Sequence, residues 1–215
     1  MPHADERGSW IDQFMLRDDV FQPFRQVADA AELLARVAED RAGLTRTTYD
    51  KVRTARYQAL VLADLARLLD EDVSVLARRA DDALAPGVDP ARRARTLATV
   101  FTGTIRATAT LIDTCHTLLG VAQDLLVVRR THSRIELMAA VETLRGAAST
   151  AHLTVLANLP RVTDSVLYDE LAVGLGSLDV TLAFANRLSS AMRSDTALGG
   201  PLPAAHAASP TPASA

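Results

Sequence analysis

The sequence predicts an all-α protein built as an up-and-down helical bundle. Glycine and proline are scarce, with 10 and 9 among 215 residues, and they gather in a few short segments. The stretches between are rich in alanine, leucine and arginine at helical spacing, without strand-like alternation. This length is typical of one domain. We expect a tail at residues 1–8, a single helical-bundle domain at 9–195 and a disordered Pro/Ala/Ser tail at 196–215.

Helix starts follow from prolines and from side chains that can cap a first turn. Pro23 can open one helix, and the pair Asp89 and Pro90 opens another. Thr45 or Thr47 caps the long helix between those two. The next start lies at Thr131 or His132, and the last helix is capped by Thr163 or Asp164. With a short N-terminal helix, the expected helices lie at about 9–16, 24–42, 45–84, 90–128, 131–158 and 164–193.

Two helix ends carry clear stop signals. The run Ala85-Pro86-Gly87 ends the long helix, because proline cannot continue the hydrogen-bond ladder and glycine accepts a reversed backbone. Pro160 ends the helix that reaches Asn158 for the same reason. Long helices joined by such short turns are typical of antiparallel bundles.

Charge and cysteine content exclude several classes of protein. The chain has 23 basic and 26 acidic residues and a formal charge of -3, so its overall charge provides no attraction to nucleic acid. No apolar run approaches the roughly 20 residues of a membrane span, and no signal peptide is visible. The single cysteine, Cys115, excludes a disulfide framework and a multi-cysteine zinc site, and it is predicted to be a small core residue. We expect a cytoplasmic protein with no membrane or nucleic-acid partner, no metal and no cofactor.

One carboxylate of the long helix lies among apolar residues. At about 100° per residue, Asp72 falls in the middle of a face formed by Val61, Leu65, Leu68, Leu69 and Leu76. We expect Asp72 to point toward the core and Asp70, nearly opposite, to face solvent. A buried acid needs a partner, so Asp72 either braces a neighbouring helix or belongs to a functional site.

Two further polar stripes follow the later helices. Small and polar residues share a narrow sector of the helix at 131–158, which we expect to face inward: Glu136, Ala140, Thr143, Ala147, Thr150, Thr154 and Asn158. Small residues on an inward stripe either let two helices approach closely or leave room for a ligand. On the helix at 90–128 the stripe is Arg106, Thr110, Asp113, Thr117, Gly120 and Asp124, with His116 at its edge. That stripe is either a solvated face, or Asp113 and His116 form an acid/base pair lining a cavity.

Several segments resemble the formimidoyltetrahydrofolate cyclodeaminase and methenyltetrahydrofolate cyclohydrolase family. The segment 158–164, Asn-Leu-Pro-Arg-Val-Thr-Asp, resembles the family's Asn-Leu-x-x-Ile-x-Asp turn. The segment 69–73, Leu-Asp-Glu-Asp-Val, resembles its Asp-x-Asp-Ala segment, and the small-residue helix before Asn158 matches its alanine-rich helix. In this alignment Glu136 takes the place of the aspartate in the family's Ser-Asp pair. The resemblance spans roughly residues 10–193 and implies a helical bundle of the cyclodeaminase type that dimerises.

The chain departs from the family at its ligand-binding loop. The family's Pro-Gly-Gly-Gly-Ser loop, which helps to form its folate pocket, falls on residues 23–27, Pro-Phe-Arg-Gln-Val. Its Gly-Asn turn falls on Arg129-Arg130, and its serine before the aspartate becomes Ile135. Glycines let backbone N–H groups approach a ligand closely, whereas Phe24 and Arg25 fill that space. We expect a substrate other than folate.

The resemblance thus implies ring closure or opening at a carbon–nitrogen bond by proton transfer. The predicted protein is a homodimeric cyclase or related lyase acting on a small-molecule substrate in secondary metabolism. Its predicted catalytic residues are Asp72 and Glu136, one or the other of which is the general acid/base. The predicted substrate-binding residues are Arg25, Asp113, His116, His132, Thr154 and Asn158. Two alternatives stay open: a non-catalytic binding or scaffold protein on the same fold, and a folate cyclohydrolase with an altered loop.

Overall fold

A computed structural model describes residues 22–39, 44–126, 131–162 and 164–198. These residues form five α-helices and one short 3-10 helix, and the described part contains no strand. The elements are α2 (Gln22–Val37), α3 (Arg46–Leu84), α4 (Pro90–Leu126), α5 (Thr131–Asn158), η2 (Leu159–Arg161) and α6 (Ser165–Leu198). The predicted all-α fold class is confirmed.

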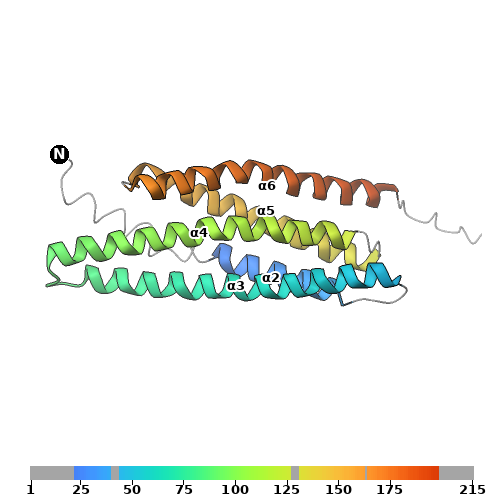
Figure 1. Cartoon of the computed structure of the whole chain (residues 1–215), viewed down its shortest axis with the longest axis horizontal. Coiled ribbons are helices and arrows are strands. Elements are labelled where there is room, and N and C mark those ends of the chain that lie inside the picture. Colours follow the sequence, from blue (N-terminus) through green and yellow to red (C-terminus); the bar gives the residue numbers. More distant parts are fainter. Residues whose placement is uncertain (1–21, 40–43, 127–130, 163, 199–215) are drawn as a thin grey trace, which may run out of the picture.

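The helices run alternately up and down along one long axis (Figure 1). α2 packs between α3 and α5, α4 packs against α3, α5 and α6, and α5 also contacts α6. Each of these helices therefore lies beside the one that follows it in the chain, which is the arrangement that the short connections favour.

The predicted capping residues lie where three helices begin. The Thr45 hydroxyl accepts a hydrogen bond from a first-turn backbone N–H of α3 at 3.3 Å. Asp89 does the same for α4 at 2.8 Å, with Pro90 as the first helical residue. The Asp164 Oδ1 accepts two backbone N–H groups of α6, at 2.9 and 3.2 Å. These acceptors satisfy donors that a helix start leaves without a partner.

The helix ends agree less closely with the prediction. α3 ends at Leu84 as expected, and Gly87 takes the left-handed conformation, with φ of 86°. α5 ends at Asn158 as expected, and η2 follows. α2 ends at Val37, shorter than predicted, whereas α6 continues to Leu198, beyond the predicted end at Arg193. Residues 196–198, expected to begin the C-terminal tail, thus belong to α6. The expected helix at 9–16, the end of α2's expected range at 42, the expected end at 128, the tail at 1–8 and residues 199–215 lie outside the described residues.

The core of the bundle is formed by alanines on one face of α3 and by larger side chains on its neighbours. Its largest fully buried side chains include Phe24, Leu34, Leu111, Leu118 and Leu144. The buried face of α3 consists of Val52, Ala55, Ala59, Ala63, Ala66 and Val73. Small side chains let α2 and α4 approach the α3 backbone closely, so the bulky residues of α3 are left for its other faces.

The α3–α4 hairpin extends beyond the other helices at one end of the molecule (Figure 1). A second, smaller hydrophobic cluster fills this extension. It contains Ala80 and Ala83 from α3 and Leu97 and Val100 from α4, with Leu76 and Leu84 packed against it. Within the described residues, α3 and α4 alone build this part of the structure.

Candidate functional site

An open groove of about 430 Å³ lies between α3 and α4. Its polar lining residues are Asp72 and Arg79 from α3 and Arg106 and Thr110 from α4. Its apolar lining is Leu69, Val75, Leu76, Gly103 and Ala107. A carboxylate, two guanidinium groups and a hydroxyl beside an apolar floor can bind a small anionic molecule and exchange protons with it.

Gly103 sets how closely α4 approaches α3 beside this groove. A Cβ at position 103 would lie 2.8 Å from Leu76 Cδ1, closer than side-chain carbons normally approach. Because Gly103 has no side chain, Leu76 can pack directly against α4 at this position. Both Gly103 and Leu76 line the groove. Close packing at this point forms the floor, while the outer side stays open.

The structure corrects the predicted orientation of the acidic run on α3. Asp72 is exposed and lines the groove instead of pointing into the core. The apolar residues around it do share one face, but Val61 and Leu68 are exposed, and the others are half-buried. The prediction failed because the alanine face of α3, not the leucine face, packs on the core.

Asp70 is correspondingly not the solvent-facing residue that the sequence predicts. Its side chain is 19% exposed and lies between α3 and α2. Arg25 Nε donates a hydrogen bond to Asp70 Oδ2 at 3.2 Å. The other oxygen, Oδ1, is buried and accepts no hydrogen bond from the described part of the chain. Arg25 is thus tied to Asp70 at the edge of α2 and is not among the residues lining the groove.

Phe24 occupies the core where the resemblance places a glycine-rich loop. The segment at 23–27 is the start of α2, and Phe24 is only 1% exposed within the main hydrophobic cluster. A helix with a core aromatic side chain cannot offer a ligand the open backbone that consecutive glycines offer. This finding agrees with the expectation that the loop has been replaced.

Glu136 is exposed on α5, against the expectation that it points inward. It is not among the residues lining the groove, so the chain by itself does not place it beside Asp72. Its catalytic role therefore stays a prediction. The inward orientation was inferred from small neighbours in its stripe, and only some of these are buried, Ala140 and Ala147 among them.

The C-terminal end of that stripe does turn inward. Asn158 is 1% exposed, and its Nδ2 donates a hydrogen bond to the Thr154 carbonyl at 2.7 Å. Thr154 is half-buried. The bond joins two residues one turn apart at the end of α5, where the helix changes into η2. The described contact is structural, and ligand binding by these two residues remains a prediction.

Of the two alternatives for the stripe on α4, a solvated face or an acid/base pair, the structure agrees better with the solvated face at Asp113 and His116. Asp113 is exposed on α4. His116 Nδ1 instead shares a hydrogen bond with the Thr181 hydroxyl of α6 at 3.0 Å, and its ring lies 5.9 Å from that of Phe184. His116 thus connects α4 to α6 away from the groove. The side chain of His132 lies outside the described residues.

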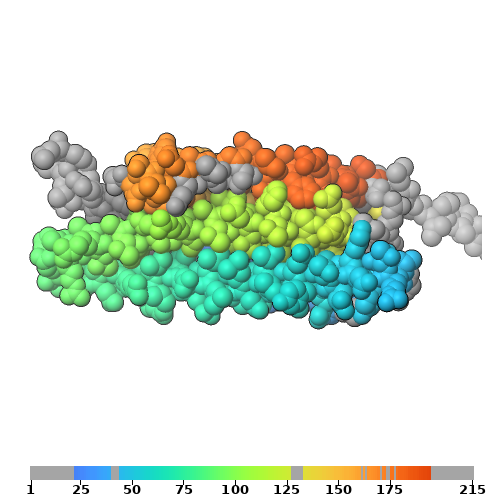
Figure 2. All heavy atoms as spheres, in the orientation of Figure 1, coloured from blue at the N-terminus to red at the C-terminus, as the bar shows by residue number. Residues whose placement is uncertain are grey.

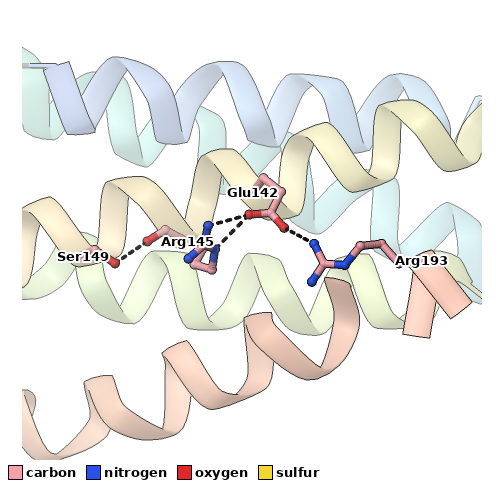
Figure 3. Close-up of polar contacts among 4 residues, drawn as sticks. All are labelled: Glu142, Arg145, Ser149 and Arg193. Carbon is pink, nitrogen blue, oxygen red and sulfur yellow. Dashed lines mark hydrogen bonds and ion pairs between the residues drawn. The ribbon is translucent and has the colours of Figure 1, made fainter. Parts of the chain in front are cut away.

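A polar cluster that the sequence analysis missed joins α5 to α6 (Figure 3). Arg145 donates to Glu142 at 2.8 Å, and Arg193 of α6 lies 3.4 Å from the other oxygen. The Ser189 hydroxyl, which is buried and makes no hydrogen bond within the described structure, lowers the pKa of Glu142 most through its polarity. Burial raises this pKa, and the two arginines lower it further. The spacing of Glu142 and Arg145, one helical turn, was the available signal.

Two classes of chemistry find no site in the described residues. Cys115 is fully buried, and burial raises the pKa of its thiol to about 12, so it is no nucleophile. No group of three His, Cys, Asp or Glu side chains in the described ranges is placed to hold a metal ion.

None of the described helices is both long and apolar enough to cross a membrane.

Comparison with known proteins identifies a family and solved structures of similar fold. The sequence model of the family described as formiminotransferase-cyclodeaminase matches residues 24–175. The crystal structure of formiminotetrahydrofolate cyclodeaminase from Thermotoga maritima is similar to this chain with a TM-score of 0.62. The two share 13% identity over 87% of this chain and 95% of the other. A search of curated protein sequences found no match.

Proposed function

The chain belongs to the formiminotransferase-cyclodeaminase family, and from this premise we propose that it is an enzyme that closes or opens a ring at a carbon–nitrogen bond. The site of this reaction is the α3–α4 groove. One observation carries the proposal: Asp72 lines an open groove together with Arg79 and Arg106. The groove supplies a proton-transfer group and cations for an anionic substrate in one place.

Each polar residue of the groove has a distinct task in this proposal. When the ring closes, the attacking nitrogen forms its bond to carbon and gives its proton to the Asp72 carboxylate, which passes that proton to the group that leaves the same carbon. Ring opening runs the same steps in reverse. Arg79 and Arg106 bind an anionic group of the substrate, for which guanidinium groups are well suited. The Thr110 hydroxyl can donate to or accept from a neutral substrate group. The apolar floor covers the remaining part of a small ring.

We further propose that the substrate is a small anionic molecule other than folate, as in a biosynthetic pathway of secondary metabolism. The support is the start of α2, where Phe24 belongs to the core and Arg25 is paired with Asp70. No glycine-rich backbone remains there to bind a folate ring. Membership of the formiminotransferase-cyclodeaminase family favours folate chemistry, so a folate cyclohydrolase is the competing assignment.

Binding and turnover of folates decide between these two assignments. Tetrahydrofolate and methenyltetrahydrofolate are titrated into the full-length protein by calorimetry, and loss of the methenyl chromophore is followed. We expect neither micromolar binding nor turnover. Binding together with turnover would overturn the non-folate proposal and leave the enzyme assignment standing.

The role of Asp72 is tested with an isosteric variant and a neighbouring control. The wild-type protein is incubated with a metabolite extract, and consumed and formed compounds are identified by mass spectrometry. Asp72→Asn should lower the conversion by about 10²- to 10⁴-fold, the usual contribution of an acid/base group. Glu71→Gln is the matched control, because Glu71 is an exposed acid on the same helix outside the groove. Equal activity of the two variants would refute the role of Asp72, and a scaffold protein would show no conversion at all.

A further inference from the structure

The polar groups of the α3–α4 groove lie in a fixed order along the two helices. Gly103 of α4 lies against Leu76 of α3, and Arg93 Nε of α4 donates a hydrogen bond to the Ala83 carbonyl of α3 at 3.1 Å. These two contacts set an antiparallel register, in which residue numbers rise along α3 as they fall along α4. We call the level of Leu76 and Gly103 the middle of the groove, because the other lining residues lie to either side of it.

Both arginines of the groove lean toward its middle. Arg79 follows Leu76 by three residues on α3, and Arg106 follows Gly103 by three residues on α4. Because the helices are antiparallel, the two Cα atoms lie on opposite sides of the middle, each about 4.5 Å from it along the axis. Long side chains on a helix point back toward its N-terminus, so here the two guanidinium groups converge over the middle. A guanidinium group only donates hydrogen bonds, so the middle of the groove suits an anion.

The groove offers hydrogen-bond acceptors on the side of its middle that lies away from the hairpin tip. Asp72 precedes Leu76 by one turn of α3, and Thr110 follows Arg106 by one turn of α4. The Asp72 carboxylate leans further from the arginines, toward the N-terminus of α3, and it only accepts hydrogen bonds. The Thr110 hydroxyl donates its proton to the Arg106 carbonyl at 3.0 Å, so it presents a lone pair to a ligand. This end of the groove therefore suits a group with N–H donors.

The charged residues around the groove agree with this division. Asp113 lies one turn of α4 beyond the acceptor end, on the same face, and is exposed. On α3 near that end, Asp64 is paired with Arg67 at 2.7 Å. Toward the hairpin tip, Asp82 of α3 and Arg95 of α4 lie at nearly the same level with opposite charges, so they add no net charge. The groove is thus positive at its middle and negative at the end that Asp113 extends.

An apolar wall joins the two polar regions. It is formed by Leu69, Val75, Leu76, Gly103 and Ala107. Figure 2 shows α3 and α4 exposed side by side at the hairpin end of the molecule, so solvent reaches both helices there. The middle of the groove and the level of Asp72 are four residues apart on α3, or about 6 Å along the axis. A short carbon chain can cover the apolar wall over that distance.

We propose that the groove binds a small zwitterion, an amine that carries a carboxylate or phosphate about 6 Å from its nitrogen. Arg79 and Arg106 bind the acidic group over Leu76, and Asp72 and Thr110 accept hydrogen bonds from the ammonium group. This inference rests on the proposed function and names its substrate class, because the nitrogen beside Asp72 is the one that attacks. The bound ammonium first loses one proton to water, and the neutral amine then closes the ring with proton transfer through Asp72.

Probes that differ in their charged groups test the substrate class. γ-Aminobutyrate carries an amine and a carboxylate, aminopropylphosphonate an amine and a phosphonate, butyrate only the acid and butylamine only the amine. Binding of each probe to the full-length protein is measured by NMR titration at millimolar concentration. A zwitterionic probe should bind about 10-fold more tightly than butyrate or butylamine, and the tighter of the two zwitterions identifies the acidic group. Equal affinities of zwitterionic and singly charged probes, or no binding of either zwitterion, would overturn the inference.

Variants test which residues bind each charge. Arg79→Gln should weaken the binding of the zwitterion about 10-fold and leave butylamine binding unchanged. Asp72→Asn should weaken the binding of the zwitterion and of butylamine, but not that of butyrate. Arg78→Gln is the matched control for Arg79, because Arg78 is exposed on α3 outside the groove. All three substituted residues are exposed, so the melting temperatures should stay near that of the wild type. Equal weakening of butyrate and butylamine by Arg79→Gln would refute the proposed order of charges.

Conversion of a metabolite separates this inference from the proposed function. A compound that the wild type converts, and that Asp72→Asn does not, should contain both an amine and an acidic group. A converted compound that lacks either group would overturn the zwitterion and leave the proposed function standing. Binding of a zwitterionic probe with the expected effects of the variants, but without conversion of any compound in a metabolite extract, would refute the proposed function alone.

Discussion

Replacing Phe24 by alanine is expected to destabilise the whole bundle. Phe24 is 1% exposed and belongs to the main hydrophobic cluster, at the first turn of α2. Truncating a fully buried aromatic ring to alanine costs about 3–5 kcal/mol through lost contacts and the cavity left behind. In a chain of this size 1 kcal/mol corresponds to roughly 2–4 °C, so the melting temperature should fall by about 6–20 °C.

Urea and thermal unfolding of the full-length chain measure this loss, with Phe184→Ala as control. Phe184 is half-buried on α6, so the same truncation should cost less there, about 1–2 kcal/mol. The expected loss follows if Phe24 belongs to the hydrophobic core and does not merely occupy an unused ligand pocket. A loss below about 1 kcal/mol for Phe24→Ala, together with new binding of tetrahydrofolate, would refute it.

Two further predictions concern a helix cap and the cluster on α5. Asp164→Ala should lower the free energy of unfolding by about 1 kcal/mol, because two backbone N–H groups of α6 lose their acceptor. Asp164→Asn keeps an oxygen at this position and should lower the free energy of unfolding less. Equal losses in the two variants would contradict the capping role. The pKa of Glu142 is lowered in the folded chain from its usual 4.5, so its ionised form stabilises the fold at neutral pH and this contribution is lost as the pH falls below 4.5. The stability difference between wild type and Glu142→Gln, at most about 1 kcal/mol at pH 7 because the group is partly exposed, should therefore vanish on acidification in urea titrations, and a difference that grows would refute the assignment.

Local chemistry made three helix starts and the end of α5 predictable. Thr45, Asp89 and Asp164 act within one turn of their own position, so a single short segment contains the whole signal. Pro90 and Pro160 act equally locally through a missing N–H group and a fixed φ. The order of long helices with short connections then leaves few arrangements besides the up-and-down bundle that the structure shows.

Which face of each helix turns toward the core was not predictable in the same way. Periodicity correctly grouped Asp72 with Val61 and Leu68, but it gives only relative angles on a helix. Which face turns inward depends on what packs against it, and around α3 the neighbours fit against alanines such as Ala59 and Ala63. A ranking by hydrophobicity alone favours leucine over alanine for the core, and so it reversed the positions of Asp70 and Asp72. The hydrogen bond of His116 was not predictable for the same reason, because its partner Thr181 is 65 residues away in the chain.

The projecting end of the α3–α4 hairpin has a consequence for local stability. Of the described helices only α3 and α4 bury the small cluster around Ala80 and Val100, and that cluster is separate from the main core. Such a segment can open and close while the rest of the bundle stays folded, and its amide protons then exchange with solvent sooner than those of α2 or α5. Leu76 packs against this cluster and also lines the groove. A ligand held in the groove against Leu76 should therefore slow amide exchange at the hairpin tip.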